Sequence, residues 1–308
     1  MTRILDGIDA FIDRLESVDL QPLSLAILCH LLKMACTSMA WRNVLAASYP
    51  NARVRWRSIY GAYLAGVGVN AIVPARVGDA MRIFLAHRAI PGSTYTTVIS
   101  STLVLSIFDL FASSMLLGWA IATGAVPGLQ VLATLESFDF AWLFARPLLF
   151  ELLVAGLLLV FTLLAFWIRV HVANFWARVG QGFRVLFPPT RYLGRVAVWQ
   201  AGDWLLRLAA IWFFLEAFDI PQSLETATLV QVSQSLATLL PITPAGIGTE
   251  QAFLVYMLAG AAPASVLLAF SVGAKLTMTV TNVVAGFTAI AVTLRTVRYS
   301  RALETREP

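Results

Sequence analysis

The sequence predicts an all-α fold, namely a polytopic integral membrane protein whose helices form a bundle. Of the 308 residues, 59% are hydrophobic and only 13% are charged, whereas an average soluble domain has about 25% charged residues. Apolar stretches long enough to cross a bilayer recur along most of the chain, and two of them are interrupted by proline and glycine. These observations predict about five full crossings and two re-entrant or broken-helix hairpins.

The first twenty residues (1–20) are expected to form an amphipathic helix at the membrane interface. Apolar residues such as Ile4, Ile8 and Phe11 recur there at helical spacing, with acidic residues between them. A frayed polar leader is the alternative. Residues 21–295 are then predicted as a single membrane domain, and residues 296–308 as a cytoplasmic tail.

Five apolar stretches reach the length of about 17 to 25 residues that a spanning helix needs. The interrupted stretches, 58–86 and 223–262, carry their prolines and glycines near the middle, so each half is too short for a full span. Because hydrocarbon offers backbone groups no water, such breaks persist only where protein or a wet cavity satisfies them. The five expected spans are 22–40, 94–123, 147–168, 196–218 and 264–294.

Loop charges predict the orientation of the chain in the cell membrane. Residues 41–57 contain four arginines and residues 169–195 contain five, and neither segment contains an acidic residue. Arginine and lysine gather in cytoplasmic loops, so these segments and the arginine-bearing C-terminus are expected inside, and the N-terminus outside. Five crossings fit this orientation only if both interrupted segments return to the side from which they entered.

The order span, hairpin, span then occurs twice with opposite orientation, as an inverted repeat. The halves cover about 22–123 and 196–294, and the span 147–168 connects them. The two interrupted stretches carry similar motifs, Pro74-Ala75-Arg76-Val77-Gly78-Asp79 and Pro244-Ala245-Gly246-Ile247-Gly248-Thr249-Glu250. Chance similarity of these two short motifs is the alternative to a repeat. Transport sites commonly lie near the bilayer midplane at the interface of such repeats.

The first interrupted stretch offers groups that suit a lipid phosphate. Arg76, Asp79 and Arg82 are spaced by three, so on one helix they would share a face. Two guanidinium groups beside a carboxylate suit a phosphate, although charges at the interface can also simply snorkel to water. Asn70 is expected either to cap the broken backbone or to contact the ligand. The candidate residues of this motif are Asn70, Pro74, Arg76, Gly78, Asp79 and Arg82.

The second motif has small side chains, so backbone N–H groups at a helix start can approach an anion. Glu250 is expected either to cap the helix or to take part in proton exchange. The candidate residues of this motif are Pro241, Thr243, Pro244, Gly246, Gly248, Thr249 and Glu250.

Charged and polar residues inside the spans form a third set, expected to face the interior and to pair. Asp203 and Arg207 are four residues apart and are predicted to pair on one helix, while Asp109 is the nearest acceptor for Lys33 and Lys275. A structural ion-pair network is the alternative to a proton relay. The set is Lys33, Asp109, Asp203, Arg207, Gln234 and Lys275.

Other functional classes find no support in the sequence. The three histidines are scattered without metal-ligand spacing, and no catalytic or nucleotide-binding motif is present. We therefore expect no metal, no cofactor and no catalytic residue. The arginines lie in loops between apolar segments, which argues against nucleic acid as a partner.

The two motifs, Asn70 to Asp79 followed by Arg82, and Leu239 to Glu250, resemble the signature regions of the lysylphosphatidylglycerol synthase transmembrane, or flippase-like, family. Trp41, Arg42 and Asp109 also match family positions, whereas Leu105 and Ser106 replace an acidic and a basic residue that members often carry. The resemblance implies partners among membrane lipids, such as anionic phospholipids or polyprenyl-phosphate-linked sugars. No aminoacyl-transfer domain follows the last span, so we do not expect this chain to synthesise lysylphosphatidylglycerol by itself.

The leading hypothesis is translocation of an anionic phospholipid or a lipid-linked phosphate across the cytoplasmic membrane. One alternative is an intramembrane transferase that acts on a lipid-phosphate donor with Asp79 or Glu250 as base. The other alternative is a non-catalytic membrane partner of a separate lipid-modifying enzyme. The sequence leaves open which lipid is moved and in which direction.

Overall fold

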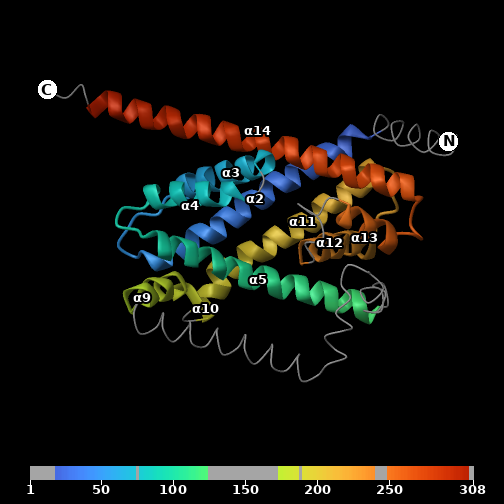
Figure 1. Ribbon diagram of the computed structural model, residues 1–308, viewed down its shortest axis with the longest axis horizontal. Coiled ribbons are helices and arrows are strands. Elements are labelled where there is room, and N and C mark those ends of the chain that lie inside the picture. Colours follow the sequence, from blue (N-terminus) through green and yellow to red (C-terminus); the bar gives the residue numbers. More distant parts are fainter. Residues whose placement is uncertain (1–17, 74–75, 124–172, 187–188, 240–247, 305–308) are drawn as a thin grey trace, which may run out of the picture.

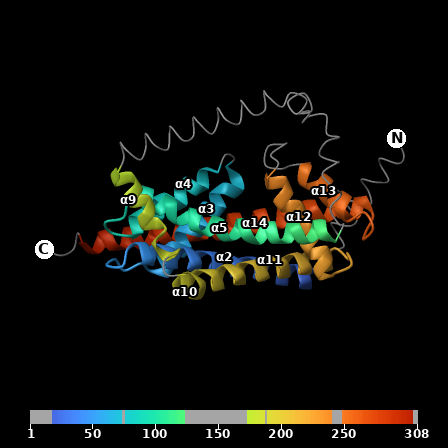
Figure 2. The same cartoon turned by 90° about the horizontal axis from the view of Figure 1, so that it is seen from below.

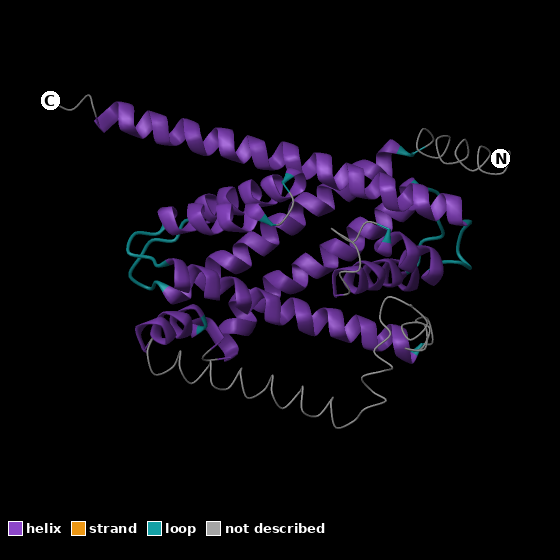
Figure 3. Cartoon of the chain, in the orientation of Figure 1, coloured by secondary structure: helices purple, strands orange, loops and turns teal. Residues whose placement is uncertain are grey.

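In a computed structural model, the described part of the chain is a bundle of α-helices whose long members lie along one axis (Figures 1 and 3). The structure describes residues 18–73, 76–123, 173–186, 189–239 and 248–304. These ranges contain no strand, which confirms the all-α prediction. The predicted interfacial helix at 1–20 and the predicted span at 147–168 lie wholly or almost wholly outside the described residues.

Two antiparallel helices, α2 (Leu20–Ser48) and α11 (Val198–Ala217), form the centre of the bundle. The Asp19 backbone N–H donates to the Ala217 carbonyl oxygen at 3.1 Å, so the start of α2 lies beside the end of α11. The Asp19 carboxylate also caps α2, since it accepts from the Gln21 N–H. A π-helical turn, Leu193–Ala197, leads into α11.

The first interrupted stretch forms an antiparallel hairpin of α3 (Trp56–Ile72) and α4 (Val77–Ala89). The start of α3 and the end of α4 lie at the same end of the bundle, as Figure 1 shows. Their closest approach is at two glycines, because a Cβ atom on Gly66 would lie 2.7 Å from the Gly78 carbonyl oxygen. The stretch therefore turns back, as the sequence predicted.

The second interrupted stretch contains α12 (Leu224–Leu239) and α13 (Thr249–Met257). These helices also pack against each other, with the Ser233 hydroxyl 3.1 Å from the Met257 sulfur. This second hairpin enters from the opposite end of the bundle to the first (Figure 1).

Two long helices, α5 (Tyr95–Ala122) and α14 (Ala264–Glu304), flank the central pair in Figure 1, and Figure 2 shows both of them along the long axis of the bundle. Helix α14 packs along α3 and is tied to α2 by the hydrogen bond between His30 Nε2 and Asn282 Oδ1, at 2.8 Å. It continues into the stretch 296–308 that was predicted as the tail.

The arginine-rich segments gather at one end of the bundle. Helix α9 (Ala173–Gly182), a 3-10 turn at Arg184–Leu186 and the short α10 (Pro189–Tyr192) lie beside the loop between α2 and α3 (Figure 1). Gln181 Nε2 donates to the Ser48 carbonyl oxygen at 2.8 Å and joins the two segments. Segments that the loop charges assigned to one side of the membrane therefore do lie together.

Among the described residues, three helices are long and apolar enough to cross a membrane: α2, α5 and the Ala264–Val292 part of α14. Helix α11, at the predicted span 196–218, is not among them, because polar residues such as Asp203, Arg207 and Glu216 lower its hydropathy. Helix α11 nevertheless lies along α2 for most of its length, with Asp203 buried.

Close glycine contacts let the first hairpin pack against α14. A Cβ atom on Gly68 would lie 2.7 Å from Gly286 Cα, and one on Gly286 would lie 2.5 Å from Gly68 Cα. The Gly66-Val67-Gly68 segment thus serves close helix packing, as expected in membranes.

Replacing Gly68 by valine is expected to lower the free energy of unfolding by about 1–3 kcal/mol, because the new side chain meets the α14 backbone rather than a flexible side-chain end. Unfolding in detergent with increasing SDS, followed by tryptophan fluorescence, measures the change. Gly118→Val on α5 is the matched control, since a Cβ there meets nothing within 4 Å. Equal losses in both variants would contradict the packing argument.

Candidate functional site

Asn70 closes the break in the first hairpin. Its side-chain oxygen accepts a hydrogen bond from the Gly78 N–H at 2.7 Å, and its side-chain nitrogen donates to Asp79 Oδ1 at 3.0 Å. The first bond satisfies a backbone donor at the start of α4 that no residue of that helix can satisfy. Of the two roles expected for Asn70, the capping role is therefore present. Pro74 lies outside the described residues.

Arg76 does not share a helix face with Asp79 and Arg82. It precedes α4 in a left-handed backbone conformation, with φ of 57°, and it is exposed. A residue other than glycine pays about 1–3 kcal/mol for such strain. The spacing argument therefore holds only for Asp79 and Arg82, whose charged groups are 3.4 Å apart.

Arg82 turns from α4 toward the centre of the bundle. Its Cβ lies against Gly66, where any larger residue would collide with it. Its guanidinium carbon is 5.9 Å from the centre of the Trp41 ring, close enough for a cation–π contact. Arg82 is therefore the arginine of the first motif whose side chain faces the interior of the bundle.

Arg82 lines a partly enclosed polar cavity of about 150 Å³ between α2, α3, α4, α5 and α11, which we name the first chamber. A cavity of this size has room for several water molecules, since one water needs about 10–15 Å³. The lining residues are Lys33, Thr37, Trp41, Tyr63, Arg82, Thr102, Leu105, Ser106, Asp109, Gln200, Asp203 and Arg207.

Hydrogen bonds fix both carboxylates of the first chamber. Asp203 accepts from the Thr37 hydroxyl at 2.5 Å and from Arg207 Nη2 at 2.9 Å, which confirms the predicted pair on α11. Asp109 accepts from the Trp204 indole N–H at 3.0 Å. Three cations and two carboxylates line the chamber, so it has one net positive charge.

A second, larger cavity of about 590 Å³ lies between α5, α11 and α12, and we name it the second chamber. Ser106, Asp109 and Arg207 line both chambers, so the two adjoin at these residues. The second chamber also includes Gln231 and Gln234 of α12. Two adjoining cavities, a polar one and a mainly apolar one with polar side chains in its wall, therefore extend from the first hairpin, through the bundle, to the second hairpin.

Two guanidinium nitrogens in this region have no partner in the described chain. The Nε–H groups of Arg82 and Arg207 are buried and donate to no acceptor among these residues, and the buried Gln231 Oε1 accepts from no donor. A buried donor without a partner costs about 1–3 kcal/mol, and more when it is charged.

The second motif has a different geometry. Gly248 has φ of 88°, which favours glycine, and its N–H donates to Gln251 Oε1 at 2.8 Å. Glu250 forms an ion pair with Lys275 at 2.9 Å. The prediction that Asp109 is the acceptor for Lys275 was therefore wrong, because α13 brings a closer carboxylate to α14.

Neither Glu250, Lys275 nor the buried Thr249 lines a described chamber. The remaining candidates of this motif, Pro241, Thr243, Pro244 and Gly246, lie outside the described residues.

Sequence reasoning missed several chamber residues, among them Thr37, Tyr63 and Gln200. Helical spacing carried a usable signal, since Lys33, Thr37 and Trp41 repeat every four residues on α2. Thr102, Leu105, Ser106 and Asp109 likewise follow the i, i+3, i+4, i+7 pattern on α5. A polar stripe within an apolar span indicates a face that looks into the bundle.

The sequence profile of the lysylphosphatidylglycerol synthase transmembrane region matches residues 4–286 of this chain. The chain belongs to this family. Membership, together with the three helices that are long and apolar enough to cross a membrane, indicates a helical membrane protein with a lipid-related role. No curated protein and no solved structure matches the chain significantly.

For this family member, Asn70→Leu is expected to lower stability by about 1–3 kcal/mol, because the Gly78 N–H loses its acceptor at the break. SDS titration of the purified protein measures the loss. Asn51→Leu, in the exposed loop before α3, is the control and should change stability little. If both variants unfold at the same SDS fraction as the wild type, the hydrogen bond from the Gly78 N–H to Asn70 does not stabilise the break.

Proposed function

We propose that the protein translocates an anionic phospholipid or a lipid-linked phosphate across the cytoplasmic membrane. In this proposal the head group passes through the two chambers while the acyl chains stay in the bilayer. The observation that carries the proposal is the pair of adjoining cavities between the two hairpins, which share Ser106, Asp109 and Arg207 in their walls.

Charge supports an anionic head group. Isolated charges inside a membrane cost about 2.5–3.5 kcal/mol each on insertion scales, and such residues usually serve a substrate or proton pathway. Five charged side chains line the first chamber, with three cations against two carboxylates.

The arrangement of the hairpins supports alternating access. Helices α2, α3, α4 and α5 form one group of span, hairpin and span, and α11, α12, α13 and α14 form another whose hairpin enters from the opposite end. We interpret the two groups as inverted repeats that rock against each other, with Asp109 and Arg207 at the point where the chambers adjoin. In this proposal the span 147–168 connects the repeats and completes five crossings.

Arg82→Gln and Arg207→Gln are each expected to slow translocation of fluorescent phosphatidylglycerol in proteoliposomes at least about tenfold, as loss of a charge-assisted contact worth about 1.5–3 kcal/mol predicts. Dithionite quenching of lipid in the outer leaflet gives the rate. Arg88→Gln, on the exposed face of α4, is the control and should match the wild type. Unchanged rates in both chamber variants would refute the proposal.

Two further measurements test whether Arg76 contacts the head group and whether the protein is a transferase instead. Arg76→Gly keeps the left-handed turn and removes the charge, so a slower rate in this variant would show that Arg76 itself contacts the head group. A new lipid species in the same proteoliposomes, detected by mass spectrometry, would instead favour a transferase.

The proposed topology predicts that a cysteine at Asn51 and one at His87 are labelled from the same side of the membrane, because the first hairpin returns to the end from which it entered. A cysteine at Gly260, between α13 and α14, should be labelled only from the opposite side. Membrane-impermeant maleimide added to sealed vesicles of known orientation distinguishes the sides, after Cys29 and Cys36 have been replaced by serine. Opposite accessibility of positions 51 and 87 would refute the hairpin topology.

A further inference from the structure

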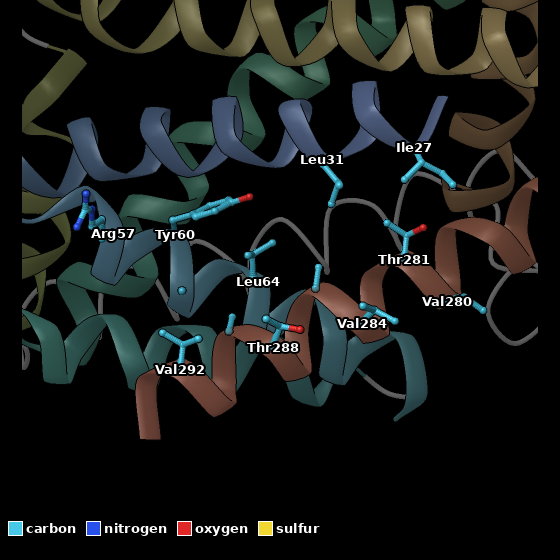
Figure 4. A pocket seen from close by; sticks show the side chains of 13 residues that line it. Ile27, Leu31, Arg57, Tyr60, Leu64, Val280, Thr281, Val284, Thr288 and Val292 are labelled. Atoms are coloured by element: carbon cyan, nitrogen blue, oxygen red, sulfur yellow. The ribbon is translucent and has the colours of Figure 1, made fainter. Parts of the chain in front are cut away.

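A groove of about 580 Å³ runs along the outside of the bundle between α2, α3 and α14 (Figure 4). This volume lies within the range of small-molecule pockets, roughly 300–1,000 Å³. Aliphatic side chains dominate its walls, with Ile27 and Leu31 from α2, Leu64 from α3 and Val284 from α14.

The groove is separate from the chambers. No residue lines both, because α2 and α3 present different faces to each. Helix α3, for instance, turns Tyr60 and Leu64 to the groove and Tyr63 to the first chamber. The groove therefore lies outside the proposed path of the head group.

Its shape suits an extended hydrocarbon chain. The α14 residues along it run from Val280 to Val292, which is about 18 Å at the helical rise of 1.5 Å per residue. Half of a bilayer's hydrocarbon core is about 15 Å thick. Val280, Val284 and Val292 are each more than half exposed, so no described part of the chain covers this face.

Positive charge marks one end of the groove. Arg57 and Tyr60 lie together there, as Figure 4 shows, and Arg55 precedes them at the start of α3. The first turn of α3 contains no acidic residue, and none of the residues that line the groove is acidic. An anionic group at this end would meet the guanidinium of Arg57, whereas the Tyr60 hydroxyl points along the groove, away from Arg57 (Figure 4).

We propose that the groove binds a resident anionic phospholipid, with one acyl chain along α14 and the phosphate at Arg57. The lipid fills the space between the first hairpin and α14 and is not the molecule that passes through the chambers. Since α3 packs on α14 through Gly68 and Gly286, a lipid beside this contact braces the hairpin against its neighbour.

The test uses the full-length protein in nanodiscs that contain phosphatidylglycerol with a photoreactive group on its acyl chain. Cross-linked peptides, identified by mass spectrometry, are expected from 27–31 of α2 and 280–292 of α14. Unlabelled phosphatidylglycerol should compete better than phosphatidylcholine by about fivefold, the effect expected of one arginine near an anionic head group.

Two matched pairs of variants test the chain and the phosphate separately. Val284→Trp fills the groove at an exposed position and should remove most of the labelling, whereas Val272→Trp, exposed on α14 outside the groove, should not. Arg57→Gln should abolish the preference for phosphatidylglycerol. Arg53→Gln changes the charge equally outside the groove and should keep the preference.

Equal competition by the two lipids in the wild type would overturn the proposal, as would labelling that Val284→Trp leaves unchanged. Cross-links between two copies of the chain at 280–292 would instead assign the groove to a protein interface and would also overturn it. Labelling measures occupancy at equilibrium, so its failure leaves the translocation rates standing. Failure of the translocation assay likewise leaves the labelling result standing.

Discussion

The Asp203 carboxylate joins the two central helices, and the rest of the bundle is arranged around that junction. It lies on α11, is almost fully buried, and accepts from Thr37 of α2 and from Arg207 one turn further along its own helix. In hydrocarbon such a carboxylate is stable only with partners. Asp203 therefore fixes how α2 and α11 face each other, and it holds Arg207 at the boundary between the two chambers.

The two hairpins meet the same constraint on broken backbones in different ways. At the first break, the Asn70 side chain satisfies the Gly78 N–H and also orients Asp79. At the second, Gln251 turns back to the Gly248 N–H, and glycine takes the left-handed conformation without strain. At the first break, Arg76 takes a left-handed conformation at a cost that glycine would avoid.

Helices α2 and α3 divide the molecule into a polar and an apolar side. Their polar faces, with Lys33, Thr37 and Tyr63, line the first chamber, while their aliphatic faces line the outer groove. A helix with two such faces lets one thin layer of protein separate the polar interior of the bundle from the apolar groove. This division explains how charged residues and a lipid-sized groove coexist within one short hairpin.

The sequence by itself determined the all-helical class, the hairpin turns and the end at which the arginine-rich loops gather. These features follow from local rules, since apolar length, proline, glycine and loop charge act over few residues. The sequence also identified the pair of Asp203 and Arg207, whose spacing on one helix is enough to bring them together.

Only the tertiary structure decided which residues meet from distant helices. In the structure Lys275 forms an ion pair with Glu250 rather than with Asp109. Arg82 lines the first chamber, whereas Arg76 is exposed. The tertiary structure also brought Thr37 of α2 to Asp203 of α11. Such contacts depend on how helices rotate and approach one another, and close approaches such as Gly68 against Gly286 set those geometries across more than 200 residues of chain.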